Sequence, residues 1–476
     1  MEYNKQMKST EKVVILFVIL LPLLFALLVN AAPLAVDYSR SILAVRESLI
    51  SGDRERALEA LESALEYTPW RGDLWQQIGR LHMESGELDN ALTAFEEAQA
   101  LGQLDPQGQV WLADMLISNG YGDAAKHVLV NIDDSDTFIL LQAAALLRTL
   151  NDHEGVVELL TKAHTLDAQN SELNYLLGIH QMAEEPGNAL AYLELALTDA
   201  SRGASAAYLV QTIQQYGELI GSGEWYLYAG QALSQAGEWD LAVYSFDSAT
   251  AIMPENATAW ALLGEAQQQN GDDGKSTLDM AVKLDADGEM VNGMLGLFYR
   301  RQGNLQQALT HLQIAHRVNP LATVWLIESG RTMAAMGNLE EALEQFNKAI
   351  EIDKQDIEAW KARAEFSILH NYQVETTGLE SARQALTLDK ANPVLMDLLG
   401  TAYMMMGDFD SAERLFSQAL QHDPEQAAIL IHLGQLYLYR EDRETAFDFL
   451  RRAVSSARDD RLRDMANRLL EENGAR

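Results

Sequence analysis

Hydrophobic and polar residues follow two different patterns in this chain. Residues 13–29 form one unbroken apolar run with no charged side chain. From about residue 38 onward, apolar residues recur three or four positions apart, and turns rich in Gly, Asn and Asp interrupt them. The first pattern predicts a single apolar helix, and the second predicts a long body made of amphipathic helices.

The apolar N-terminal run is long enough to cross a membrane. Fifteen of residues 13–29 are Val, Ile, Leu or Phe, and a weaker apolar stretch continues to Val36. A helix over 13–36 spans a hydrocarbon core of ~30 Å, and the fifteen strongly apolar side chains favour insertion by ~5–9 kcal/mol. We therefore expect a transmembrane signal-anchor helix at 13–36 after a short cytoplasmic N-terminus at 1–12.

The charges that flank this segment predict its orientation. Three lysines precede it, whereas two arginines, Arg40 and Arg46, follow it. This excess of cations places the N-terminus inside and the body outside the cytoplasm. Cleavage as a signal peptide stays open, because Val29-Asn30-Ala31 has the small-residue spacing of a cleavage site. An inverted topology with a cytoplasmic body also stays open.

One frame of residues recurs through the body about every 34 positions. Its order is a large apolar residue, Leu, Gly, an aromatic residue, a turn, Ala, a second large residue, Ala and Pro. A complete example comprises Met396, Leu399, Gly400, Tyr403, Ala412, Phe416, Ala419 and Pro424. We count about twelve such units, which begin near 38, 72, 108, 137, 171, 223, 257, 289, 323, 357, 393 and 427. This order and spacing resemble the tetratricopeptide repeat (TPR).

The resemblance implies an all-α fold: a right-handed superhelical solenoid of about twelve TPR helical hairpins preceded by one transmembrane helix. Stacked hairpins bury a continuous core that one hairpin cannot bury alone. We expect an N-terminal TPR array at 38–200 and a C-terminal TPR array at 223–459. Residues 201–222 hold about one helix between glycines, which predicts an irregular helical insert or hinge. Residues 460–476 are expected to form a capping helix.

Composition excludes several classes of function. The chain has 35 Lys and Arg residues against 70 Asp and Glu residues, a formal net charge of −35. Such a surface repels a phosphate backbone, so we expect no nucleic-acid partner. No cysteine is present, and the ten histidines have no metal-ligand spacing. We therefore expect no catalytic residue, no cofactor and no metal site, and conclude that the chain is not an enzyme.

The resemblance also implies where a partner binds. TPR arrays hold peptides or protein surfaces on the concave face that the first helix of each repeat lines. Reading the inward positions of the repeat frame gives candidate peptide-binding residues: Leu297, Arg300, Arg301, Ile327, Arg331, Lys361, Met404 and Tyr439. Because Arg pairs well with carboxylates, we expect an acidic or C-terminal peptide, with Arg301, Arg331 and Lys361 as charge anchors. Alternatively, these cations pair with acidic residues of adjacent helices.

These observations predict a non-catalytic, membrane-anchored TPR scaffold. It would bind proteins or peptides in its concave groove and tether or assemble a complex at the cell envelope. One alternative is a regulatory subunit of a membrane enzyme, such as a polysaccharide polymerase or glycosyltransferase. Another is a secreted, soluble TPR binding protein that remains after signal cleavage. Exposed apolar groove residues would also permit self-association.

Overall fold

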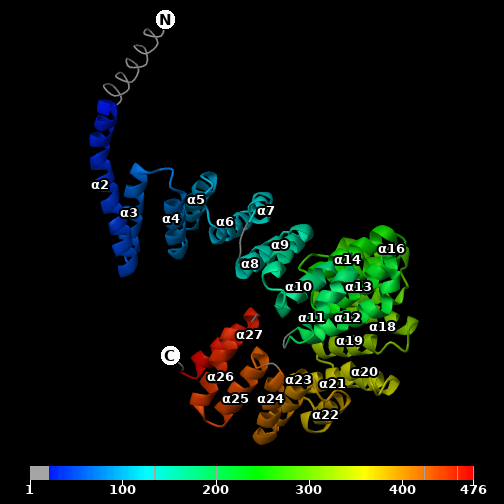
Figure 1. Cartoon of the computed structure of the whole chain (residues 1–476). Coiled ribbons are helices and arrows are strands. Elements are labelled where there is room, and N and C mark those ends of the chain that lie inside the picture. Colours follow the sequence, from blue (N-terminus) through cyan, green and yellow to red (C-terminus); the bar gives the residue numbers. More distant parts are fainter. Residues whose placement is uncertain (1–20, 133–135, 200–201, 423, 458, 475–476) are drawn as a thin grey trace. The chain divides into compact units, whose positions relative to one another are not determined.

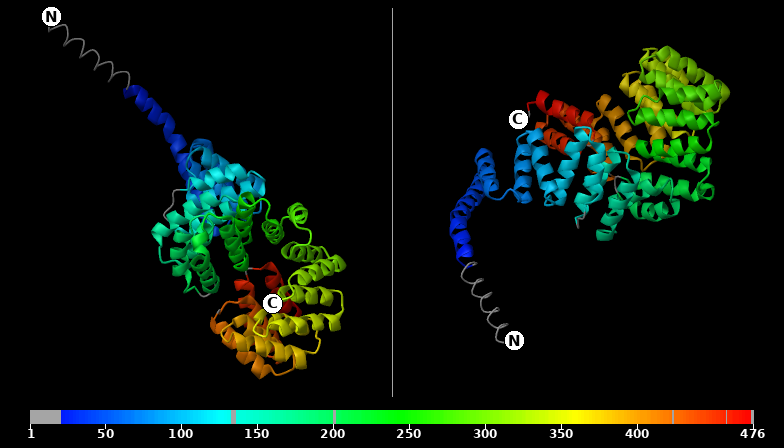
Figure 2. Two further views of the ribbon diagram at one scale, coloured as in Figure 1. Left: turned by 90° about the vertical axis from the view of Figure 1, so that its right-hand side faces the viewer. Right: turned by 90° about the horizontal axis from the view of Figure 1, so that it is seen from above.

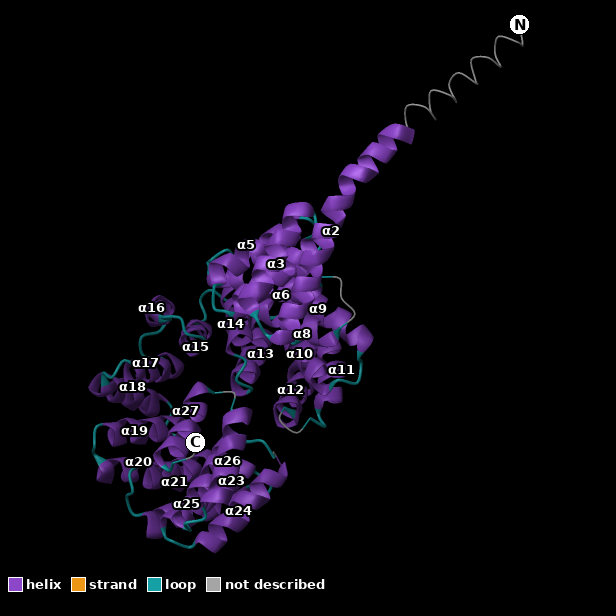
Figure 3. Cartoon of the chain, turned by 90° about the vertical axis from the view of Figure 1, so that its left-hand side faces the viewer, coloured by secondary structure: helices purple, strands orange, loops and turns teal. Residues whose placement is uncertain are grey.

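The described part of the chain is helical throughout (Figures 1 and 3). The computed structural model describes residues 21–132, 136–199, 202–422, 424–457 and 459–474, and over 21–35 it describes the backbone alone. These residues form 26 α-helices, one 3-10 helix and one π-helix, without a strand. The helices up to Leu173 begin and end as follows: α2 (Leu21–Ser51), α3 (Arg54–Tyr67), α4 (Gly72–Glu84), α5 (Leu88–Ala100), α6 (Pro106–Ser118), α7 (Gly122–Val130), α8 (Thr137–Thr149) and α9 (His153–Leu166).

Most of the remaining helices follow one another as hairpins. They are α10 (Ser171–Gln181), α11 (Pro186–Ala196), α12 (Gly203–Tyr216), 3-10 helix η2 (Gly217–Leu219), α13 (Gly223–Gln235), α14 (Trp239–Ile252), α15 (Ala257–Gln269), α16 (Lys275–Leu284), α17 (Glu289–Arg301), α18 (Leu305–Val318), α19 (Thr323–Ala335), α20 (Leu339–Ile352), α21 (Ile357–Leu369), π-helix η3 (Val374–Gly378), α22 (Leu379–Leu388), α23 (Pro393–Met405), α24 (Phe409–His422), α25 (Ala427–Tyr439), α26 (Arg443–Ser456) and α27 (Asp460–Glu472).

The N-terminal region differs from the expectation of two separate helices. Residues 1–20, which include the expected cytoplasmic N-terminus and the start of the expected membrane segment, lie outside the described residues. The rest of that segment belongs to α2, which continues without a break into the first repeat region. Among the described helices, none is both long and apolar enough to span a membrane.

The chain divides into two compact units, with the boundary between Leu173 and Asn174. In the first unit, α4 packs against α5, α6 against α7 and α8 against α9. In the second unit, hairpins from α13–α14 to α25–α26 pack in chain order, and Figure 2 shows the successive green, yellow and orange hairpins side by side. The array boundaries expected at residues 200 and 223 therefore do not coincide with this division, and they stay predictions.

The repeat frame produces these hairpins through one close contact. In the regular hairpins of the second unit, a Gly of the first helix faces a bulky side chain of the second helix. A Cβ added at Gly296 would lie 2.6 Å from Leu312 Cγ, and one added at Gly400 would lie 2.6 Å from Phe416 Cε1. Because any side chain at these positions would separate the paired helices, the glycines set their close approach.

Helix α12 stands between the α10–α11 and α13–α14 hairpins and is packed on both sides. It contacts α11 and α13. Its side chains Leu209, Val210 and Ile213 belong to one hydrophobic cluster that extends from α10 to α15. In the expected hinge, such a cluster would be interrupted. The described part of 201–222 therefore contains α12, which is built into a continuous core, and the short η2; a hinge at this segment stays a prediction.

A buried polar network holds the start of α12. Glu238 accepts hydrogen bonds from the Tyr175 hydroxyl (3.0 Å) and from Arg202 Nη1 (3.1 Å). The Arg202 guanidinium also lies over the Tyr175 ring, 4.7 Å from its centroid. Burial and the neighbouring Glu238 carboxylate raise the pKa of Tyr175, so the hydroxyl stays a donor. This network ties α12 to the turn between α13 and α14.

The α21–α22 hairpin replaces the Gly-and-bulky pair by two alanines. Ala364 stands where the other hairpins of the second unit have Gly, and it shares a buried cluster with Ala382 of α22. The π-helix η3 precedes α22 and takes up the altered length of the turn. Arg363 occupies a position that is Leu in four of the other five first helices from α15 to α25. Its guanidinium donates to Ser381 Oγ (2.8 Å) and to Asn347 Oδ1 (2.7 Å).

Helix α27 closes the C-terminal end of the array. It packs against α26 and α25. Leu462, Leu469 and Leu470 lie on the cluster formed around Leu430 and Leu450. The opposite side of α27 is charged. This is the arrangement expected of a terminal cap, which must cover a core on one side and meet water on the other.

Candidate functional site

The first helices of successive repeats form a continuous row in the second unit. We call α15, α17, α19, α21, α23 and α25 the A helices. Each contacts the next: α15 touches α17, α17 touches α19, α19 touches α21, α21 touches α23 and α23 touches α25. A row of parallel helices offers one extended surface made from equivalent positions of many repeats. This surface is the candidate interface, and its two ends differ in chemistry.

The first part of the row carries a network of ion pairs, which we call the ionic ladder. Its members come from α15, α17, α19 and α21: Glu265, Arg300, Arg301, Glu328, Arg331, Glu358, Lys361 and Glu365. Arg301 pairs with Glu265, and its Nε donates to Gln268 of α15 (3.2 Å). Arg300 reaches forward to Glu328 of α19 (2.9 Å). The ladder therefore links each A helix to its neighbour.

Arg331 is the most connected cation of the ladder. Its guanidinium lies 2.7 Å from Glu328, 2.8 Å from Glu358 and 3.5 Å from Glu365. Burial alone would lower the pKa of Arg331, but the carboxylates of Glu328 and Glu358 raise it by more. Lys361 lies between the same two carboxylates of α21, 3.2 Å from Glu358 and 3.6 Å from Glu365. The cations of the ladder are thus neutralised within the chain.

The second part of the row is almost without charge. Across α23 and α25, Asp397 is the one acidic residue and His432 the one basic residue. They face each other, with His432 Nδ1 2.7 Å from Asp397 Oδ1. Burial lowers the pKa of His432, and the carboxylate of Asp397 raises it by more, so the net shift is upward. This pair is an isolated polar contact inside an apolar surface.

Seven of the eight candidate peptide-binding residues fall into three groups in the structure. Arg300, Arg301, Arg331 and Lys361 lie in the ionic ladder; the three arginines pair with acidic residues of adjacent helices, as in the alternative, and Lys361 pairs with acidic residues of its own helix. Leu297 and Met404 are half-buried and pack on core clusters. Tyr439 is 67% exposed at the end of α25 and stacks on Phe409, with ring centroids 5.9 Å apart. Binding of a peptide by any of these residues stays a prediction.

Ile327 requires a correction. Its side chain is only 2% exposed, within a cluster that includes Phe346, Ala359 and Ala362. It therefore fills the space between α19, α20 and α21 and is not available to a partner. The frame position alone did not show this, because neighbouring A helices cover the middle of each helix and leave mainly its ends exposed.

Leu369, the most exposed large apolar residue among the described side chains, was not predicted as a surface residue from the sequence. It ends α21 and is 80% exposed. Its position corresponds to Arg301, Met405 and Tyr439 in other A helices. The missed signal was the absence of the usual Gly at Ala364, which obscured the frame of this repeat. Aligning the ends of the A helices, rather than their glycines, finds it.

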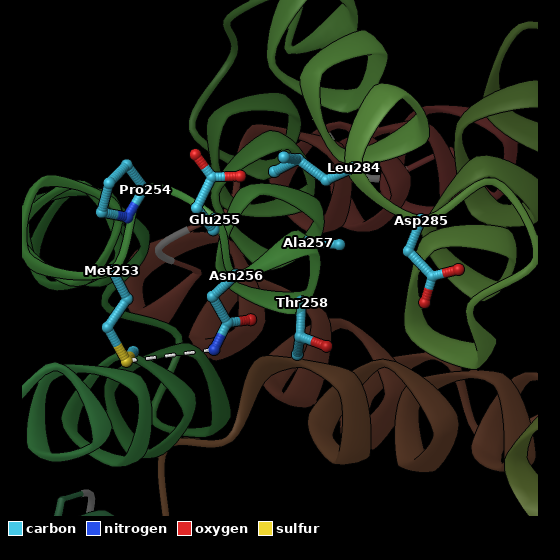
Figure 4. Close-up of a pocket in the computed structure, with 8 residues that line it drawn as sticks. All are labelled: Met253, Pro254, Glu255, Asn256, Ala257, Thr258, Leu284 and Asp285. Carbon is cyan, nitrogen blue, oxygen red and sulfur yellow. Dashed lines mark hydrogen bonds between the residues drawn. The ribbon is translucent and has the colours of Figure 1, made fainter.

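One open pocket lies at the N-terminal end of α15, between the turn after α14 and the end of α16. Its volume is about 590 Å³, and it is lined by Met253, Pro254, Glu255, Asn256, Ala257, Thr258, Leu284 and Asp285. Asn256 caps α15 by accepting a hydrogen bond from the Ala259 amide (3.1 Å). The carboxylates of Glu255 and Asp285 come from different turns and do not converge on one point (Figure 4). Nothing in this geometry indicates a catalytic or metal-binding site.

Comparison with family models identifies tetratricopeptide repeats in this chain. Two such models match it, one at residues 48–109 and 403–469 and the other at 289–355. These segments include parts of both compact units. The chain therefore contains TPR repeats, as the spacing of its glycines and alanines predicts.

Relatives with assigned names match over short segments. The BBSome complex member BBS4 of Bos taurus is 25% identical over 155 residues, which covers 32% of this chain and 29% of the relative. The homolog of Drosophila melanogaster is 28% identical over 177 residues, covering 34% of this chain and 35% of the relative. The chain thus spans about a third of these relatives.

Solved structures resemble the chain at the level of a helical repeat. A chain in the APC/C hetero-tetramer Cut9–Hcn1 is 14% identical, with a TM-score of 0.44 and coverage of 91% of this chain and 96% of that chain. Yeast Tom70 gives the same identity and TM-score, with coverage of 91% and 95%. The MamA protein is 18% identical over 35% of this chain and 91% of its own, with a TM-score of 0.30.

Proposed function

We propose that this chain is a non-catalytic scaffold that binds other proteins on its A-helix surface and helps to assemble a complex at a membrane. The observation that carries the proposal is the unbroken contact from α15 to α25, which presents equivalent positions of six repeats as one surface. Repeat arrays of this kind present extended binding surfaces. Membership of a complex is also what the name of the BBS4 relatives states for those proteins.

Membrane attachment is the second part of the proposal. The support is the sequence of residues 13–36, whose apolar length suits a bilayer. In this arrangement residues 1–12 lie in the cytoplasm, the helix at 13–36 crosses once and the repeats lie outside. Fractionation of cells tests the anchor: the full chain stays in the membrane pellet after alkaline carbonate extraction, and a chain that lacks residues 1–36 does not. Recovery of an intact, full-length chain in the soluble fraction would contradict it.

Site-specific photo-crosslinking tests the A-helix surface. Val324 and Val394 are both half-exposed and stand second in α19 and α23. A photo-reactive residue at either position should capture the same discrete protein partner in intact cells. The matched control is Thr310, an exposed residue of α18, which belongs to the other helix of its hairpin. Capture at Thr310 alone would place the interface elsewhere. No capture at Val324 and Val394 would refute an interface on the A-helix surface.

A further inference from the structure

We infer that the C-terminal end of the A-helix surface binds a cationic amphipathic helix of a partner protein. This inference rests on the proposed function and reverses the charge that the sequence predicts for the partner. It depends on four apolar residues at the ends of three adjacent A helices, which we call the apolar strip: Leu369, Met405, Met406 and Tyr439.

The residues of the apolar strip are exposed at the ends of adjacent A helices. Leu369 ends α21, Met405 ends α23 with Met406 directly after it, and Tyr439 ends α25. Leu369 is 80%, Met405 42% and Tyr439 67% exposed. Tyr439 stacks on Phe409, which lies three residues beyond Met406, so the end of α25 contacts the first residue of α24. Large apolar side chains exposed together at equivalent positions mark a contact surface.

The spacing of the apolar strip suits a helix as ligand. Neighbouring packed helices lie ~8–10 Å apart, so the strip offers one apolar side chain about every 10 Å. Residues seven positions apart on an α-helix are ~10.5 Å apart and lie on nearly the same face. A helix with a large apolar residue at every seventh position therefore places one anchor on each A helix. Met and Tyr are also residues that adapt well to a partner surface.

The charge around the apolar strip selects a cation. The segments that follow the three helices, residues 370–378, 406–410 and 440–444, contain six carboxylates and two arginines. Arg440, one of those arginines, already pairs with Asp410 (2.5 Å) and Glu413 (2.6 Å). Glu375, Glu441 and Glu444 are exposed. Lysines or arginines beside the apolar anchors would meet these carboxylates, whereas an acidic peptide would be repelled.

The ionic ladder explains why an acidic peptide finds no counterpart on the rest of the surface. Of the charge anchors that the sequence suggests, Arg301 and Arg331 are bound by carboxylates of neighbouring A helices, and Lys361 is bound by carboxylates of its own helix α21. An acidic ligand would have to displace Glu265, Glu358 or Glu365, and each displaced carboxylate would lose its pair. A cationic ligand at the apolar strip breaks no such contact.

The test measures binding of designed peptides to the full-length chain, held in nanodiscs of zwitterionic lipid with empty nanodiscs as the blank. The probe is a fluorescent helical peptide with Leu at every seventh position and lysines beside each Leu. Its counterpart has glutamates in place of the lysines. We expect the lysine peptide to bind at least tenfold more tightly than the glutamate peptide, and its affinity to fall as salt is raised from ~20 to ~300 mM.

Variants of exposed residues locate the site. Leu369→Ser with Tyr439→Ser should weaken the lysine peptide at least tenfold. The control, Val318→Ser with Leu321→Ser, changes two exposed residues beside the α18–α19 connection and should leave binding unchanged. Glu441→Lys with Glu444→Lys should weaken the lysine peptide and strengthen the glutamate peptide. Circular dichroism of each variant confirms that the helices are retained.

Clear outcomes overturn the inference. It fails if neither peptide binds, if the glutamate peptide binds as well as the lysine peptide, or if the control variant loses binding equally. It also fails if light scattering shows a dimer that Leu369→Ser with Tyr439→Ser dissociates, because a second copy would then occupy the strip. Photo-crosslinking at Val324 and Val394 remains an independent readout, so the scaffold function can stand when the peptide result is negative.

Discussion

At the scale of single residues, the fold depends on pairs of side chains that compensate for each other. Where Gly296 or Gly400 opposes a bulky residue, the hairpin is regular. Where Ala364 replaces the Gly, the opposing residue is also small, Ala382. The smaller opposing residue leaves room for the added Cβ of Ala364, although the two alanines together have less side-chain volume than Gly with Leu or Phe. Such exchange explains how the repeat tolerates departures from its usual sequence.

Substitution of Gly296 by Ala tests this compensation. The added Cβ would lie 2.6 Å from Leu312, so we expect Gly296→Ala to destabilise the α17–α18 hairpin by about 1–3 kcal/mol. Hydrogen exchange of the amides in these two helices measures the effect. Gly187→Ala in α11 is the matched control, because nothing lies within 4 Å of the new Cβ, and it should be neutral or slightly stabilising. Equal exchange rates in both variants would refute the close-contact argument.

The pair His432 and Asp397 predicts a pH dependence for α23 and α25. Because the folded-state pKa of His432 is raised, the folded protein binds this proton more tightly than the unfolded chain does. The stabilisation is complete below the unfolded pKa of ~6.5 and is lost as pH rises through the folded-state pKa. Protection factors of α25 amides should therefore fall several-fold from pH ~6 to pH ~8.

Two histidine variants provide the comparison for this pH dependence. His432→Gln should remove most of the fall in protection. His316→Gln should leave it unchanged, because burial and then Lys348 lower the pKa of His316, which lies on α18. Protection that rises with pH, or a slope that survives in His432→Gln, would exclude the pair as its cause.

At the scale of helices, α12 shows how a single helix is built into an array of hairpins. Its apolar side chains join the cluster that continues from α10 to α15, and Arg202 joins it to Glu238. A regular repeat would supply a second helix for this purpose. Here a buried carboxylate takes over part of that role. The position of the lone helix α12 therefore depends more strongly than that of a hairpin on a single polar contact, the one between Arg202 and Glu238.

Glu238→Ala tests that dependence. Without the carboxylate, the Tyr175 hydroxyl and the Arg202 guanidinium lose a shared acceptor, which should cost about 1–3 kcal/mol. We expect Glu238→Ala to accelerate hydrogen exchange in α12 more than in α17, relative to the unsubstituted chain. Glu218→Gln, an exposed change in the neighbouring η2, is the control and should have no effect. Unchanged exchange in α12 would show that apolar packing alone fixes this helix.

The sequence predicts the hairpins more reliably than it predicts the exposed surface. The frame that contains Gly296 and Gly400 predicts the hairpins because the close approach of the two helices at these positions leaves no room for a larger residue than Gly. Exposure depends instead on which neighbours cover a side chain, so Ile327 was expected at the surface and is buried. Leu369 was missed for the converse reason, since its repeat lacks the Gly that marks the frame. Tertiary contacts, which a repeat frame does not contain, decide both cases.

At the scale of the whole molecule, charge opposes compaction. The formal net charge is −35, and the arginines of the ionic ladder are already paired. Most of the excess negative charge comes from carboxylates that are spread over the helices, and these carboxylates repel one another. Ions screen such repulsion over a Debye length of ~10 Å at 0.1 M salt. Screening should therefore stabilise the folded chain more than it weakens the partly exposed ion pairs.

Thermal unfolding at different salt concentrations checks this balance. We expect the unfolding temperature to rise by a few degrees between ~10 and ~150 mM NaCl, because self-repulsion weakens. Sucrose at matched osmolality separates screening from general exclusion effects, and it should give a smaller increase. A fall in unfolding temperature over this range would mean that the ion pairs, rather than the excess of carboxylates, dominate the electrostatic free energy.

The direction of the pairs in the ionic ladder limits how such an array can evolve. Arg301 binds an acid of the preceding repeat, whereas Arg331 binds acids of the following repeat. The repeats from α15 to α21 are therefore not interchangeable modules. Duplication or loss of the α19–α20 unit would bring arginines beside arginines or leave carboxylates together. Changes in repeat number are thus disfavoured within this segment, and new repeats are more readily gained where the A helices are uncharged.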